Sequence, residues 1–147
     1  MIRIAHRGNL NGPNPEKENE PSYIVSAINQ GFDCEVDLWK TENGFFLGHD
    51  EPQYEIKDSF LFELSDKLWI HCKNLDALTF ISSQASTLNG FWHQEDDFTL
   101  TTKGFIWTYP NRPTSEKSIL VHLGVGSQLL EKKRLKGICS DFFIPST

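Results

Sequence analysis

Long apolar runs are missing from this sequence, and cysteine is scarce. No segment of the 147 residues approaches the roughly 18 consecutive apolar residues of a membrane-spanning helix. Residues 1–6 lack the apolar stretch of a secretory signal peptide. The three cysteines, Cys34, Cys72 and Cys139, are odd in number and far apart, which disfavours a disulfide framework or a zinc site. We therefore expect reduced, buried thiols in a cytoplasmic protein with no membrane span.

Positive charge is also in deficit. The chain has 14 Lys and Arg against 20 Asp and Glu, which gives a formal net charge of −6. A surface of this sign repels nucleic acids and anionic membranes, so we expect neither as a partner, although a local basic pocket for a small anion stays open. The sequence contains no internal repeat and no low-complexity tract. Its length fits a single domain over residues 1–147.

What the sequence does contain is a succession of short apolar segments that alternate with the two-residue period of strands. Helical spacing separates some of them, whereas residues 51–66 have the mixed polar composition of a long loop. The expected strands are residues 2–6, 33–39, 68–73, 90–93, 104–109, 118–122 and 137–142. The expected helices run from an N-cap at Asn19, with Pro21 in the first turn, to Gly31; from Asn74 or Asp76 to Ser83; and over 129–135.

Polar residues recur where these strands end, which is the edge at which parallel α/β sheets and barrels place their sites. A complete eight-unit barrel needs roughly 200 residues or more. At 147 residues, several helices must be reduced or missing. The sequence therefore predicts the α/β class, and within it an abbreviated TIM-like (β/α) barrel of about seven strands. Such a barrel leaves edges that a second copy can cover, so a homo-oligomer is possible.

Two carboxylates stand out in the strand at 33–39. Alternation places Glu35 and Asp37 on one face and the apolar Cys34, Val36 and Leu38 on the other. Burying an ion without a partner costs on the order of several kcal/mol. A buried pair of carboxylates therefore indicates that a cation lies beside them. An edge strand with one wet face explains the same pattern, and residues elsewhere must decide.

Further groups at the same edge favour phosphodiester chemistry. His6 and His49 can move protons near neutral pH, and Arg7 and Lys73 can hold an anion. Glu18 joins Glu35 and Asp37 as a hard oxygen ligand suited to Mg²⁺ or Ca²⁺. Together a cation, two basic side chains and two imidazoles suit the cleavage of a small phosphodiester. Each residue also has a structural explanation, such as a hydrogen-bonded histidine at a strand end.

These residues match a family in order. The chain resembles the glycerophosphodiester phosphodiesterases over residues 2–50, and more weakly at 70–73, 106–108 and 137–141. The strong matches are His6-Arg7-Gly8, Glu18-Asn19, Glu35-Val36-Asp37, Thr41-Glu42-Asn43-Gly44 and His49-Asp50.

The resemblance implies a TIM-like barrel that holds a divalent cation, with His6 and His49 as the acid–base pair. It implies metal binding by Glu35 and Asp37 with Glu18 beside them, phosphate binding by Arg7 and Lys73, and a substrate pocket lined by Trp107.

Two features depart from the family pattern. His71 stands where the family has a third carboxylate ligand, so the metal is in question and His71 is only a candidate ligand. The stretch between Lys73 and Trp107 is shorter than in full-length members, which leaves His93 as a candidate pocket residue. Besides a phosphodiesterase, the sequence is compatible with a non-catalytic module that binds phosphate esters, and with a metal-dependent sugar-phosphate isomerase.

Overall fold

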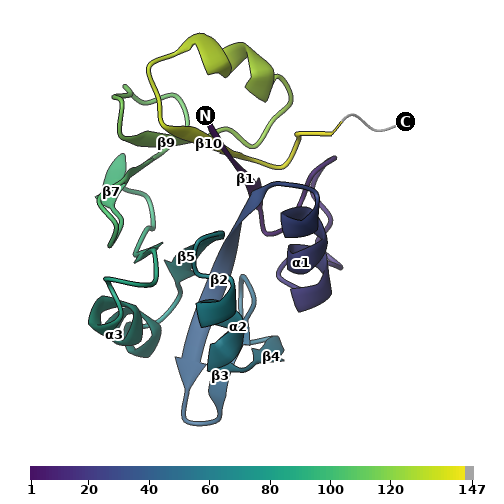
Figure 1. Cartoon of the computed structure of the whole chain (residues 1–147), viewed down its shortest axis with the longest axis vertical. Coiled ribbons are helices and arrows are strands. Elements are labelled where there is room, and N and C mark those ends of the chain that lie inside the picture. The colour runs from purple at the N-terminus through teal and green to yellow at the C-terminus, as the bar shows by residue number, and fades with distance from the viewer. Residues whose placement is uncertain (145–147) are drawn as a thin grey trace.

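The strands form one ten-stranded sheet in the computed structural model, which describes residues 1–144 (Figure 1). Neighbouring strands run parallel in the order β6-β5-β2-β1-β10-β9-β8. Their bounds are β1 Ile2–His6, β2 Asp33–Thr41, β5 Leu68–Cys72, β6 Gly90–Phe91, β8 Ile106–Thr108, β9 Ser118–Val121 and β10 Gly137–Ser140.

Three further strands are antiparallel to their neighbours. β3 (Gly44–Leu47) returns along the end of β2 and continues into β4 (Tyr54–Ile56). β7 (Phe98–Leu100) pairs with β8 at the far edge of the sheet.

The expected (β/α) barrel is wrong: the sheet is an open, curled half-barrel. Within residues 1–144 no ladder joins β6 to β7 or β8. The two edges are linked by isolated contacts instead. The Thr102 backbone N–H donates to the Gly90 carbonyl at 2.9 Å, and Thr102 Oγ1 accepts from the Gly90 N–H at 3.0 Å. Thr99 Oγ1 also donates to the Trp92 carbonyl at 2.9 Å. Closure fails because β6 has only two residues and because the chain after it turns back as β7 instead of supplying further strand–helix units.

Three α-helices cover the outside of the curl on the side of β2 and β5 (Figure 1). They are α1 Pro21–Asn29, α2 Asp58–Glu63 and α3 Leu75–Ser83. The side chains of β2 that face them, including Cys34, Val36 and Leu38, are fully buried in the larger hydrophobic core. A second core fills the inside of the curl, and its buried members are Ile4, Trp69, Phe91, Trp107, Ile119 and Cys139. The alternation expected for β2 is therefore confirmed.

Several local expectations need correction. Residues 51–66 are not one long loop, because they contain β4 and α2, which Leu61 anchors in the larger core. In place of a helix over 129–135, the structure has the 3₁₀ helix η1 (Ser127–Lys132). Asn74 caps α3 as expected, by accepting from the Ala77 N–H at 3.0 Å, but the residue at the N-cap of α1 is Glu20 rather than Asn19.

Other expectations from composition can be compared directly with the structure. The three cysteines are free and buried, as expected. None of the helices within residues 1–144 is both long enough and apolar enough to cross a membrane.

Candidate metal-binding site

Strand register brings the candidate residues together. β1 pairs with β2 so that His6 lies beside Glu35, and β2 pairs with β5 so that Asp37 lies beside His71. Paired residues on parallel strands point to the same face. Glu35 and Asp37 therefore face the inside of the curl, with a histidine on each neighbouring strand.

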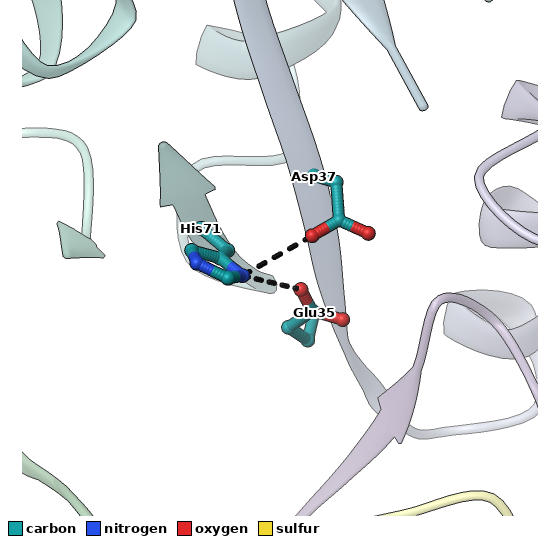
Figure 2. A group of neighbouring side chains, drawn as sticks. All are labelled: Glu35, Asp37 and His71. Atoms are coloured by element: carbon teal, nitrogen blue, oxygen red, sulfur yellow. Dashed lines mark ion pairs between the residues drawn. The ribbon is translucent and has the colours of Figure 1, made fainter. Parts of the chain in front are cut away.

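Glu35, Asp37 and His71 form a compact group of ligand atoms (Figure 2). His71 Nδ1 lies 3.2 Å from Asp37 Oδ1 and 3.9 Å from Glu35 Oε1, and all the ligand atoms are within 4.8 Å of one another. The two carboxylates are 2% and 0% exposed. Among residues 1–144, Glu35 Oε2 and Asp37 Oδ1 are buried without a hydrogen-bond partner, which is costly unless a cation satisfies them. This group can hold a metal ion.

The two carboxyl groups are electrostatically unequal. Burial raises the pKa of Glu35 well above its usual value, and the charge of Asp37 adds to this effect while Arg7 opposes it. Burial alone would also raise the pKa of Asp37, but the close approach of His71 and the charge of Arg7 outweigh burial and lower that pKa. Without a cation, Asp37 is therefore the carboxyl group that ionises first, and a bound cation would favour ionisation of Glu35 as well.

Arg7 reaches the group from the turn after β1. Its φ of 55° lies in the left-handed region, which is uncommon for a residue with a side chain. Its Nε is 3.2 Å from Asp37 Oδ2, and its Nη1 donates to Glu18 Oε1 at 3.1 Å. The other oxygen of Glu18 accepts from the Asn14 N–H at 2.7 Å. Glu18, a candidate metal ligand, therefore contacts Arg7 and lies outside the group of Glu35, Asp37 and His71.

Asn19 is a partner of Asp37 that the sequence reasoning assigned to a helix cap. Its Nδ2 donates to Asp37 Oδ2 at 2.9 Å, and its Oδ1 accepts from the Asp37 backbone N–H at 2.9 Å. The side chain is 1% exposed, and the backbone has a φ of 68°. Its place directly after Glu18 in a motif of the resembled family was the available signal for a role in the site.

A second group that sequence reasoning missed holds His6. Asp141, buried after β10, accepts from His6 Nδ1 at 2.8 Å and from Asn9 Nδ2 at 2.8 Å. Tyr23 in turn donates its hydroxyl hydrogen to Asn9 Oδ1 at 3.0 Å. In the neutral His6 ring, Nδ1 donates to Asp141 and Nε2 carries the lone pair, 3.8 Å from Glu35 Oε2. In the sequence, Asp141 was marked only as a polar residue at a strand end and as the last residue of the weak family match at 137–141.

Two predicted site residues are not joined to this group. His49 follows β3, its side chain is 45% exposed, and its Nδ1 is 2.8 Å from the Asp50 carboxylate. Lys73 follows β5, where its backbone N–H donates to the Leu38 carbonyl at 2.8 Å. The charge of Lys73 nevertheless acts on Glu35 by lowering its pKa, although burial dominates that shift.

A cavity of about 190 Å³ opens beside Glu35 and His71. Trp107 and His93 both line it; Trp107 stacks on Phe91 at 4.4 Å between ring centroids, and His93 stacks on Tyr109 at 5.9 Å. Pro110, Val121 and Leu123 add apolar surface to the wall, and His6, Arg7 and Glu35 add polar and charged groups. The lining residues are His6, Arg7, Glu35, His71, His93, Trp107, Tyr109, Pro110, Val121 and Leu123.

No protein-family model, curated protein or solved structure matches this chain. The resemblance of residues 2–50 to the glycerophosphodiester phosphodiesterases therefore stays a prediction. The geometry supports a buried group of Glu35, Asp37 and His71 that can hold a metal ion.

Proposed function

We propose that this chain is a metal-dependent phosphodiesterase of the glycerophosphodiester phosphodiesterase type that cleaves a small phosphodiester. One observation carries the proposal. The buried group of Glu35, Asp37 and His71 lies beside a cavity that His6 and Arg7 also line. A cation site, a base and a guanidinium around one cavity are the components that phosphoryl transfer requires.

Glu35, Asp37 and His71 would hold the divalent cation. The unpartnered oxygens of the two carboxylates fit this role, and carboxylates are ligands for Mg²⁺ or Ca²⁺, the ions expected from the sequence. When bound, the cation would offset negative charge on the phosphoryl oxygens. Asn19 and Arg7 both contact Asp37 Oδ2, which leaves Oδ1 for the ion.

His6 is the candidate general base. Asp141 accepts from its Nδ1, so Nε2 is the atom that can take a proton from the attacking hydroxyl group. Attack by water would give hydrolysis, whereas attack by a neighbouring hydroxyl of the substrate would give a cyclic phosphate. In both cases the bond from phosphorus to the alcohol oxygen breaks, and the leaving alkoxide takes a proton from solvent water or from His49, the acid expected from the sequence. Arg7 lines the cavity and is placed to contact a phosphoryl oxygen.

The test is release of alcohol from glycerophosphodiesters and from a chromogenic phosphodiester, with and without chelator. We expect metal-dependent turnover that His6→Ala and Asp37→Asn abolish. His122→Ala is the matched control, since His122 lies outside the group and contacts the Val125 carbonyl. Turnover that survives both chelation and His6→Ala would contradict the proposal.

One observation favours a second candidate, a non-catalytic module that binds phosphate esters. His49, the expected partner acid, is exposed, bonded to Asp50 and absent from the cavity lining. Calorimetry that detects glycerol phosphate binding, with no alcohol released from any phosphodiester over days, would select this candidate. Loss of turnover in His49→Ala, with metal affinity unchanged, would select the enzyme.

A further inference from the structure

His71 is held by contacts on one edge and one face of its ring. Its Nε2 lies 2.8 Å from the backbone carbonyl oxygen of His93. A carbonyl oxygen only accepts, so Nε2 carries a hydrogen and donates it. The ring also stacks on Phe91, with centroids 5.3 Å apart and planes 12° apart. These contacts turn the other nitrogen, Nδ1, toward the two carboxylates (Figure 2).

Nδ1 therefore faces atoms that also offer electron pairs. Asp37 Oδ1 is 3.2 Å away and has no hydrogen-bond donor in the described part of the chain, and Glu35 Oε1 is 3.9 Å away. A neutral ring with its hydrogen on Nε2 places a lone pair against these oxygens. Such an arrangement is favourable only when an electron-pair acceptor lies between the three atoms. The acceptor is a proton on Nδ1 or a metal ion.

The chemistry of the three donors limits which ion fits. Mg²⁺ and Ca²⁺ are hard cations that prefer oxygen ligands throughout. An imidazole nitrogen is a suitable ligand for first-row transition ions. In a metal-binding histidine, the N–H of the other ring nitrogen usually donates to a carbonyl or carboxylate oxygen, as the Nε2–H of His71 donates to the His93 carbonyl. Glu18 is held by Arg7 and Asn14, so this site has one nitrogen and two carboxylate ligands.

We propose that this site selects a first-row transition ion such as Mn²⁺, Fe²⁺, Co²⁺ or Zn²⁺ over Mg²⁺ and Ca²⁺, with Nδ1 of His71 as the ligand that makes the choice. The inference rests on the metal-binding part of the proposed function and is independent of phosphodiester cleavage. It replaces the hard ions expected from the sequence. Three protein ligands leave coordination positions open toward the cavity that His71 and Glu35 line.

Calorimetry on the full chain, freed of metal by a chelator, provides the first test with Co²⁺, Mn²⁺ and Mg²⁺ as probes. The wild type should bind Co²⁺ at least about 100-fold more tightly than Mg²⁺. His71→Glu converts the site to three carboxylates and should reduce that ratio by about 10-fold or more. His122→Glu makes the same exchange outside the group and should leave the ratio unchanged. Equal ratios in the wild type and His71→Glu would overturn the inference.

Pulsed electron paramagnetic resonance of the Mn²⁺-loaded wild type is the second test, and it depends on no variant folding. Direct coordination by His71 predicts a ¹⁴N coupling from a bound imidazole. An absent coupling, or one that persists in a folded His71→Glu variant, would overturn the inference, as would a wild type that binds none of these ions. If Co²⁺ selectivity and the ¹⁴N coupling are found but no phosphodiester is cleaved, the inference stands and the proposed function fails. If a phosphodiester is cleaved but the site prefers Mg²⁺ over Co²⁺, the proposed function stands and the inference fails.

Discussion

Replacing Asn19 by alanine tests how strongly the site depends on a residue that sequence reasoning placed in a helix cap. The substitution removes the donor to Asp37 Oδ2 and the acceptor of the Asp37 backbone N–H, and both atoms of Asp37 are buried. A lost hydrogen bond to a charged group costs roughly 1.5–3 kcal/mol, and a buried N–H left unpaired costs roughly 1–3 kcal/mol.

The backbone adds a further cost. Asn19 has a φ of 68°, where an alanine is disfavoured by roughly 1–2 kcal/mol. Because Arg7 still contacts Asp37 Oδ2, we expect the total near the low end, a loss of about 4 kcal/mol in the free energy of unfolding. A single domain has only about 5–15 kcal/mol of stability, so this loss is readily measured.

Urea unfolding followed by tryptophan fluorescence is the assay. Asn29→Ala is the control, because Asn29 is an exposed residue of α1, and it should change the free energy of unfolding by no more than about 0.5 kcal/mol. Asn19→Gly separates the two causes, since glycine adopts the observed φ freely but cannot bond to Asp37. Wild-type stability in Asn19→Gly would refute the reasoning, because the loss would then belong to the backbone alone.

Three further predictions follow from other contacts. Burial raises the pKa of all three thiols, that of Cys72 to about 12, whereas the unfolded chain ionises its thiols near pH 9. The stabilisation is therefore complete below that pH and falls above it. Urea unfolding should show a loss of roughly 1 kcal/mol per thiol between pH 9 and 10, and a flat profile would contradict this prediction. Thr102→Val removes the side-chain hydrogen bonds to the Gly90 N–H and the Leu88 carbonyl, whereas Thr102→Ser keeps them. The valine variant should be less stable than the serine variant by about 1–3 kcal/mol, and equal urea unfolding curves would contradict this. Asp141→Asn should lower kcat for phosphodiester cleavage by up to about 100-fold with little change in KM, because His6 loses its charged partner; a change in KM alone would argue against this role.

Short-range pattern was enough to find the two carboxylates of the group that can hold a metal ion. Two-residue alternation placed Glu35 and Asp37 on one face of β2, and parallel pairing then brought His71 beside Asp37. The first step needs only the local sequence, whereas the second joins strands that are distant in the chain and is seen only in the structure. The ligating potential of Glu35 and Asp37 was therefore predictable from their types and spacing, whereas His71 was a candidate only through its place in the family pattern.

The barrel could not be predicted in the same way, because closure depends on the whole chain. Recurring strands predicted a (β/α) barrel, but β7 reverses direction and β6 is too short to support a ladder. The roles of Asn19 and Asp141 were also hidden. Asn19 acts through Asp37, and Asp141 acts through His6, which is distant in sequence. The local sequence suggested simpler roles, a helix cap for Asn19 and a strand end for Asp141.

A crystal of the full chain grown with Mn²⁺, measured for anomalous scattering, tests the central claim most directly. The account predicts one anomalous peak about 2.0–2.3 Å from Glu35, Asp37 and His71 Nδ1, with the His71 ring still bonded to the His93 carbonyl oxygen. No peak within reach of these three side chains, or a peak ligated by other residues, would contradict it.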